Sequence, residues 1–475
     1  MAQPALPQQG RDRPGWTMPA LAAILVLHWI VLAGFWTGVG GADHYEYAMS
    51  ALDLSEGQLP DTHWGLRWPL TGTMALSVLV LGPTEFALSL PVILSSSGLV
   101  LLAYLAGRRW AGPGTGLAAA LMVATSPLFA VMRIHVHLPE MLFAVAAVIV
   151  AASADGTRLR PFAVAALLAW LAWACRETSG YLPVALGLGA PVLLRPVRRG
   201  LAAGLTVGGG FAAAVLAEWT FYRVIYGDWL YRVKTDLDHG GDMEGTGIRS
   251  APQDADTWLT PLFDAVLPSL LTPVYAAALL GGIAAPVLGF GWRPEGRRGL
   301  VYLGIGCALS YTICVGFLNL ESYRYFSILP LTGTLVAAWS IASFGRGRGR
   351  PAALTGLALI CALGIGVRIA TQARDSTTPY RLAEAALTQD AVVNTPYNTR
   401  HARLLLRLRG SDPDLLREID GPDLLTAGDL VLVSDDRAWP APSWTPLATY
   451  PPNPGPIDRL RGDAEAGQTL WRVGE

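Results

Sequence analysis

Long apolar runs separated by short polar segments are the dominant pattern of this chain. The runs reach about 17–25 residues, the length that an α-helix needs to cross a bilayer. The run Leu70–Leu81 is too short to span, and we expect it to lie at the interface or to re-enter the membrane. The pattern predicts about eleven membrane-spanning helices: Thr17–Trp36, Phe86–Leu105, Gly116–Met132, Pro139–Ala154, Phe162–Cys175, Tyr181–Leu194, Leu201–Tyr222, Ala265–Phe290, Leu300–Leu318, Phe326–Phe344 and Pro351–Ala370.

The distribution of charged residues predicts how these helices are oriented. Every second connection is rich in arginine, as is the N-terminal tail 1–16, and this is the signature of cytoplasmic loops. The remaining connections carry most carboxylates, including the loop 37–69 and the loop 223–264. The first run is long for a signal peptide and lacks an Ala-x-Ala-like site before Asp43, so we favour an uncleaved anchor. An odd number of spans then places residues 371–475 outside the cytoplasm.

The C-terminal stretch 371–475 is polar and follows the transmembrane domain 17–370. Strand-like runs at Ala391–Asn394 and Leu430–Ser434 flank a helix-like run at Arg400–Leu408, and Thr469–Val473 is a further candidate strand. This mixture predicts a small extracytoplasmic α/β domain.

Composition supports a polytopic membrane protein and excludes several other classes. Of the 475 residues, 52% are hydrophobic and only 15% are charged, and the mean hydropathy is +0.38. Soluble chains carry nearer a quarter charged residues. No phosphate-binding G-x-x-x-x-G-K-S/T motif occurs, so a nucleotide triphosphate is not the expected energy source. The four cysteines lie in apolar segments and do not form a metal or disulfide framework. We expect a bacterial inner membrane location, contact with lipids and no nucleic-acid partner, and the oligomeric state stays open.

An acidic cluster follows the first predicted helix. Asp43 and Glu46 stand three residues apart in the sequence Asp-His-Tyr-Glu-Tyr, so they share one face if the loop is helical there. Carboxylates close to a bilayer are costly, and one in a partly dry cleft can accept a proton from a hydroxyl as a general base. The alternative is a pair of solvated loop carboxylates.

A second cluster lies in the short turn before the helix predicted at Pro139. His135 and His137 alternate, and this spacing leaves a divalent metal open as a cofactor, with further ligands from elsewhere. An interfacial histidine pair without metal is the plainer interpretation. Glu140 opens the helix, where negative charge stabilises the N-terminus, so helix capping alone could explain it.

Two more charged groups stand at helix ends predicted on the same side. Arg176 and Glu177 follow one helix, and Arg324 and Tyr325 precede another. Tyrosines at such positions are typical of the interfacial aromatic belt. The arginines either anchor lipid headgroups or bind an anionic ligand through two parallel hydrogen bonds.

Taken together in order, these segments resemble the polyprenol-phosphate-dependent C-type glycosyltransferases, the group of protein O-mannosyltransferases and lipid A aminoarabinose transferases. The resemblance covers residues 17–345. It is carried by the acidic motif from Asp43, the sequence Arg67-Trp68-Pro69-Leu70, and the apolar segment ending in Arg108-Arg109. The Ser126-Pro127 segment running through Arg133 to Glu140, the sequence Arg176-Glu177-Thr178-Ser179-Gly180 and the pair Arg324-Tyr325 complete it.

The resemblance implies an inverting glycosyl transfer on the extracytoplasmic (periplasmic) face. The donor is a polyprenyl-phosphate sugar, and the acceptor is a hydroxyl of a lipid, glycan or protein. Asp43 is implied as general base, with Glu140 in a supporting catalytic position. Arg67, Arg133, Arg176 and Arg324 are implied to bind the donor phosphate, and Glu46, His137, Glu177 and Tyr325 to contact substrate.

Two other classes fit the same pattern less well. A transporter or flippase of lipid-linked sugars would place charges along a path near the midplane of the membrane, whereas these gather at one surface. A non-catalytic envelope-assembly protein would use the C-terminal domain for binding and should tolerate loss of the Asp43 carboxylate.

Overall fold

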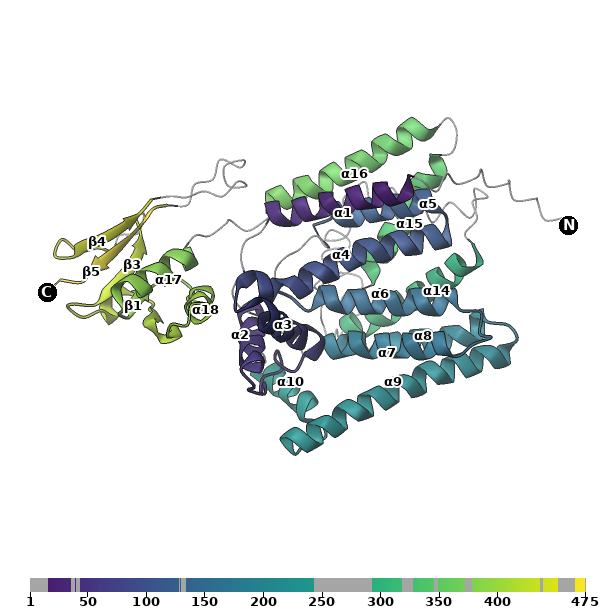
Figure 1. Ribbon diagram of the computed structural model, residues 1–475, viewed down its shortest axis with the longest axis horizontal. Coiled ribbons are helices and arrows are strands. Elements are labelled where there is room, and N and C mark those ends of the chain that lie inside the picture. The colour runs from purple at the N-terminus through teal and green to yellow at the C-terminus, as the bar shows by residue number, and fades with distance from the viewer. Residues whose placement is uncertain are drawn as a thin grey trace.

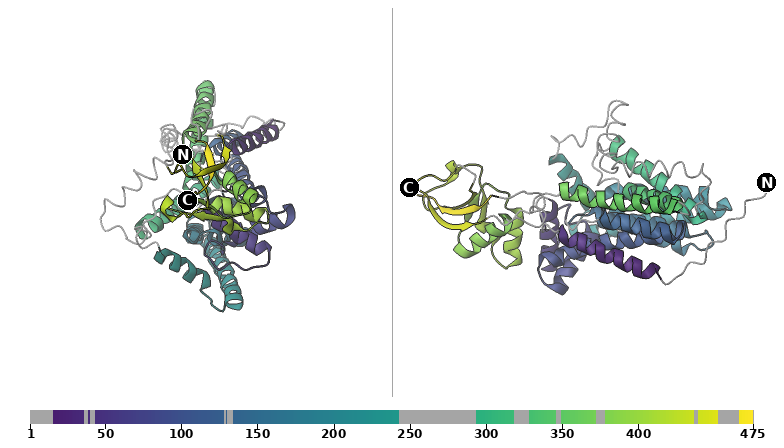
Figure 2. Two further views of the ribbon diagram at one scale, coloured as in Figure 1. Left: turned by 90° about the vertical axis from the view of Figure 1, so that its left-hand side faces the viewer. Right: turned by 90° about the horizontal axis from the view of Figure 1, so that it is seen from above.

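The computed structural model places a helical bundle beside a small α/β domain (Figure 1). It describes residues 16–35, 39, 43–127, 129, 134–242, 293–317, 328–345, 349–371, 378–435, 439–451 and 466–474. Helix α1 begins near one end of the bundle, and the α/β domain lies beyond the opposite end (Figures 1 and 2).

Ten of the predicted spans coincide with helices that run along the bundle. The remaining predicted span, Ala265–Phe290, lies outside the described residues, as does most of the predicted loop 223–264. By length and composition, α1, α4, α9 and residues Arg350–Ile369 of α16 can each cross a membrane. The ten helices are α1 (Thr17–Gly34), α4 (Glu85–Trp110), α5 (Pro113–Thr125), α6 (His137–Ser153), α7 (Arg160–Cys175), α8 (Tyr181–Leu193), α9 (Val197–Tyr226), α14 (Pro294–Tyr311), α15 (Leu329–Phe344) and α16 (Arg350–Thr371).

Arginine-bearing connections gather at the end of the bundle far from the α/β domain, which we call the arginine end (Figure 1). The backbone N–H of Arg293, just before α14, donates to the carbonyl of Trp110 at the end of α4 at 2.9 Å. Arg298 Nε donates to the carbonyl of Ala152 in α6 at 3.0 Å. These contacts place the start of α14 beside the end of α4 and the end of α6, and the predicted sidedness of the connections stays a prediction.

Helix α5 is shorter than predicted. The predicted span Gly116–Met132 is wrong at its C-terminal end, because the helix stops at Thr125 and Ser126 is extended, with ψ of 136°. Pro127 follows directly, and the residue before a proline is pushed out of the helical region. Similarly, α14 passes into a π-helical turn, η3 (Thr312–Phe317), where the prediction had one continuous helix.

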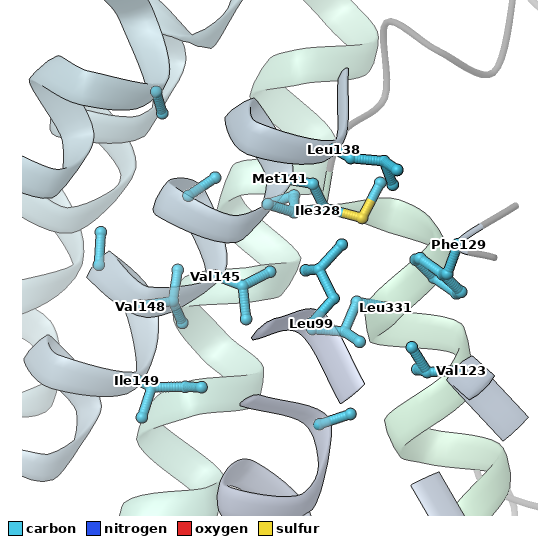
Figure 3. Packing of buried hydrophobic residues seen from close by; sticks show 14 of the residues in the cluster. Leu99, Val123, Phe129, Leu138, Met141, Val145, Val148, Ile149, Ile328 and Leu331 are labelled. Atoms are coloured by element: carbon cyan, nitrogen blue, oxygen red, sulfur yellow. The ribbon is translucent and has the colours of Figure 1, made fainter. Parts of the chain in front are cut away.

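The bundle contains a large cluster of buried hydrophobic residues, part of which is drawn in Figure 3. Leu99 of α4, Val123 of α5, Val145 of α6 and Leu331 of α15 are each at most 1% exposed. Small residues bring helices close together: a Cβ added at Gly107 of α4 would lie 2.8 Å from the Gly116 Cα atom of α5. Such close contacts favour helix packing in lipid, where burial of apolar surface gives little driving force between helices.

Three further helices cover the end of the bundle nearest the α/β domain, which we call the α2 end (Figure 1). They are α2 (Asp43–Ser55), α3 (Trp68–Leu81) and α10 (Tyr231–Asp242). Helix α3 contains the run predicted to lie at the interface or re-enter. The loop following the first span is therefore helical at the acidic cluster, which was the condition for Asp43 and Glu46 to share a face.

The C-terminal domain contains a mixed five-stranded sheet in the order β2-β1-β3-β5-β4. The strands are β1 (Val393–Thr395), β2 (Leu416–Glu418), β3 (Leu430–Ser434), β4 (Thr445–Tyr450) and β5 (Gln468–Arg472). Strand β1 is parallel to β2 and β3, whereas β5 pairs antiparallel with β3 and β4. Helices α17 (Thr378–Gln389) and α18 (Arg400–Leu408) pack on it through apolar residues such as Leu382 and Leu406. The predicted mixed α/β domain is confirmed.

The described residues also contain short 3₁₀ helices. One lies between α7 and α8, and two lie in the C-terminal domain: η1 (Glu177–Gly180), η6 (Pro413–Leu415) and η7 (Pro422–Leu424).

Candidate active site at the α2 end

The first turn of helix α2 is acidic. Asp43 and Glu46 lie in that turn, where carboxylates stabilise the helix N-terminus. Tyr47 follows Asp43 by one turn and is fully buried, so one face of the helix is packed into the protein. Partial burial raises the pKa of the Glu46 carboxyl, and the neighbouring Asp43 charge adds to this while Arg400 opposes it.

Arg67 lies against the same face of α2. It stands at the N-terminal cap of α3, and its Nη1 donates a hydrogen bond to the Tyr47 hydroxyl. The guanidinium carbon lies 5.7 Å from the centre of the Tyr47 ring. Arg67 Nε is buried and has no hydrogen-bond partner among the described residues. A buried guanidinium with an unused donor favours an anionic ligand, because burying an unpaired donor is costly.

The histidines form a hydrogen-bonded pair beside α2. The Nδ1 atoms of His135 and His137 are 2.9 Å apart, and the His137 backbone N–H also points to His135 Nδ1 at 3.3 Å. His135 Nδ1 therefore acts as the acceptor in this arrangement. The His135 ring also meets those of His44 and Tyr47 edge-on. Within the described part of the chain, no group of three His, Cys, Asp or Glu side chains is placed to hold a metal.

Glu140 faces protein rather than solvent. Its carboxylate is fully buried, accepts a hydrogen bond from Ser179 Oγ at 2.5 Å, and lies 3.6 Å from Arg176 Nη1. Arg176 is itself 5% exposed. The structure thus brings together two predicted site residues, Glu140 and Arg176, and the pairing fits a positioning role for Glu140.

A charged centre that sequence reasoning missed lies beside this pair. Arg232 of α10 is 2% exposed, and its Nε donates to Glu177 Oε1 at 2.7 Å. Its Nη1 donates to Glu218 Oε1 in α9 at 2.9 Å, and its guanidinium carbon lies 4.8 Å from the centre of the Trp173 ring. Burial on its own would raise the pKa of the Glu177 carboxyl. The positive charges of Arg232 and, to a smaller extent, Arg67 outweigh this effect, so the pKa is lowered.

The Arg232 centre extends to α3 through a chain of hydrogen bonds. Tyr222 donates to Glu218 at 2.7 Å, and Trp68 Nε1 donates to the Tyr222 hydroxyl at 2.9 Å. Trp68 directly follows Arg67 in the sequence. The network therefore links α9 and α10 to the segment that positions Arg67, and Glu177 belongs to it through its ion pair with Arg232.

The remaining predicted site residues lie outside the described residues. They are Arg133, Arg324 and Tyr325, and their assignments stay predictions. The described centre nevertheless gathers Asp43, Glu46, Arg67, Arg176 and Glu177 at one end of the bundle. Such a set can bind an anionic group and take up a proton from a hydroxyl.

No model of a known protein family matches the sequence, and no curated protein sequence matches it either. Solved structures do match. The ArnT structure from Cupriavidus metallidurans bound to undecaprenyl phosphate aligns with a TM-score of 0.56 and 13% identity, covering 97% of this chain and 99% of that chain. The apo structure of the same protein aligns with a TM-score of 0.58 and 14% identity, covering 97% of this chain and 98% of that chain.

These matches show that the chain shares the fold of ArnT over nearly its whole length, and they confirm the resemblance at the level of the fold. An oligosaccharyltransferase from Archaeoglobus fulgidus also matches, with a TM-score of 0.47 and 11% identity, over 83% of this chain and 64% of that chain.

Proposed function

We propose that this protein is an inverting glycosyltransferase that moves a sugar from a polyprenyl-phosphate donor to an acceptor hydroxyl on the extracytoplasmic face of the membrane. The observation that carries the proposal is the placement of Arg67, with its unused donor, against the helix whose first turn carries Asp43. The shared fold supports it, since the ArnT structure holds undecaprenyl phosphate.

The reaction assigns a separate task to each charged group. Asp43 takes the proton of the acceptor hydroxyl as its oxygen attacks the anomeric carbon. The bond from that carbon to the phosphate oxygen breaks, and the polyprenyl phosphate leaves as an anion without needing a strong general acid. Arg67 stabilises the departing phosphate, and Arg176, held by Glu140, adds positive charge nearby. Arg133 and Arg324 are further candidates for the same task.

Binding of undecaprenyl phosphate tests the role of Arg67. We expect Arg67→Ala to weaken binding of this lipid by about ten- to a hundredfold, because one charge-assisted hydrogen bond is worth about 1.5–3 kcal/mol. Tyr47→Phe, which keeps the ring but removes the hydroxyl that Arg67 contacts, should cost less. Binding would be measured on purified protein in detergent with the labelled lipid. Equal binding by wild-type protein and Arg67→Ala would remove Arg67 from the donor site.

The proposed sidedness predicts the location of the C-terminus. A reporter that is active only in the cytoplasm, fused after Glu475, should be silent, because the arginine end of the bundle faces the cytoplasm in this proposal. A second fusion within the Arg195–Arg199 connection should be active and serves as the control. An active reporter at Glu475 would show that the α2 end faces the cytoplasm, which is the opposite of the proposed orientation.

The function itself is tested by glycosyl transfer from synthetic undecaprenyl-phosphate sugars to a membrane extract of the source cells. Purified wild-type protein should form labelled product with at least one donor of the panel. Absence of product with every donor, from protein that still binds undecaprenyl phosphate, would favour a transporter or an assembly protein instead.

A further inference from the structure

The C-terminal domain contacts the C-terminal end of α2 directly and is joined to the residue Val39 before α2 through Glu85 of α4. These contacts are between residues far apart in the sequence. At the C-terminal end of α2, Arg407 Nη2 of α18 donates to Asp53 Oδ1 at 2.6 Å and to Glu56 Oε2 at 3.1 Å. Arg407 Nη1 also lies 3.8 Å from the sulfur of Met49, one turn earlier. One arginine of the C-terminal domain thus holds the last turns of α2.

The chain entering α2 is held through Glu85, the first residue of α4. Glu85 Oε1 accepts a hydrogen bond from the backbone N–H of Val39 at 3.2 Å, four residues before Asp43. The same carboxylate contacts His401 Nε2 of α18 at 2.8 Å and accepts from the Tyr380 hydroxyl of α17 at 3.0 Å. Glu85 therefore joins the start of α4, the approach to α2 and the C-terminal domain.

We propose that docking of the C-terminal domain through Arg407 and His401 sets the position of α2, and with it the reach of Asp43 toward the substrate. This inference rests on the proposed function for the role of Asp43. Asp53 lies ten residues after Asp43, about 15 Å along the same rigid helix, so a movement at one end is transmitted to the other. Arg407 and His401 are positioning residues, since neither touches the reacting atoms.

The contact between Arg407 and α2 is partly exposed to water. The side chains of Asp53 and Glu56 are 36% and 54% exposed, and an ion pair this open to water is weak and sensitive to salt. The Glu85 contact is more enclosed, with His401 at 7% and Glu85 at 17% exposed. The contact at Glu85 is therefore less screened by water than the contact of Arg407 with α2.

Hydrogen exchange of full-length protein in detergent tests the structural part of this inference. We expect Arg407→Glu to speed exchange of the α2 amides by about tenfold, because the helix loses its tie and gains like-charge repulsion. Arg407→Lys, which keeps the charge, should show a smaller change. Arg409→Glu is the matched control, since Arg409 is exposed at the C-terminal cap of the same helix, and it should leave α2 unchanged.

A charge swap separates positioning from damage to the fold. Asp53→Arg alone should speed α2 exchange as Arg407→Glu does, whereas Asp53→Arg combined with Arg407→Asp should restore most of the protection. A swap that fails to restore protection, or α2 exchange that is the same in Arg407→Glu and wild type, would overturn the inference.

Turnover measures the functional part, with the donor on which wild-type protein is active. Arg407→Glu should lower kcat by about tenfold while binding of undecaprenyl phosphate stays within twofold, because the donor site at Arg67 is not touched. Faster exchange with unchanged kcat would show that α2 moves without affecting catalysis, and the inference would fail there. Inactive wild-type protein would count against the proposed function, while the exchange experiments would still decide whether the domain positions α2.

Discussion

Asp43→Asn is expected to lower turnover by about 10²–10⁴-fold, the usual contribution of a positioned general base. Asparagine keeps the shape and most hydrogen bonding of the side chain at the start of α2 but cannot take up the acceptor proton. Binding of undecaprenyl phosphate should persist, because Arg67 and its contact with Tyr47 are unchanged. The loss should therefore appear in kcat for glycosyl transfer.

Two further carboxylate variants provide the comparison. Asp61→Asn alters an exposed residue between α2 and α3, and it should leave turnover within twofold of wild type. Glu140→Gln should cost less than Asp43→Asn, since the buried Glu140 carboxylate holds Arg176 and Ser179 in place. Near-normal transfer by purified Asp43→Asn protein would exclude the proposed mechanism, whatever the effect of the other two variants.

Arg232→Met is expected to cause the largest loss of stability, about 3–5 kcal/mol in the free energy of unfolding. Methionine retains the apolar stem but leaves Glu177 and Glu218 without the cation that pairs with both. Unfolding of the detergent-solubilised protein by SDS, followed by tryptophan fluorescence, would measure the change.

Lys234→Ala on the same helix is the matched control. Its ion pair with Asp228 is 60% exposed at the lysine side chain, so its removal should cost at most about 1 kcal/mol. Replacing Glu177 and Glu218 by glutamine in the Arg232→Met background should recover part of the stability, because the unpaired charges are then gone. Equal losses from Arg232→Met and Lys234→Ala would show that the buried centre contributes no more than a surface pair.

Hydropathy predicted the helices because each depends on a local requirement. A run of some twenty apolar residues must be helical in lipid, where backbone groups can find no water. The misplaced ends have equally local causes. Pro127 ends α5 early, and α9 extends beyond the predicted span at both ends, from Val197 to Tyr226.

The candidate site was only partly predictable, because half of it depends on contacts between distant segments. Asp43, Glu140 and Arg176 were found through their positions next to apolar runs, and Arg67 through the family resemblance. Arg232 lies in the predicted loop 223–264, and nothing in the local sequence distinguishes it, since its partner Glu177 lies 55 residues earlier. The strands β2 and β4 were missed for a similar reason: β2 has three residues and β4 contains a proline, so pairing rather than local sequence defines them.

The ion pair between Arg407 and Asp53 can form only late in biosynthesis, because Arg407 is translated long after Asp53. The two residues are separated by 354 positions, and a ribosome adding about 5–20 residues per second needs roughly 18–70 s to cover that distance. During this interval α2 has been translated but lacks its anchor, while the later helices are still being inserted. Under the proposed function, α2 should therefore reach its final position only after α18 has left the ribosome, and a chain that ends between α16 and α18 should turn over at least about tenfold more slowly than the full-length protein.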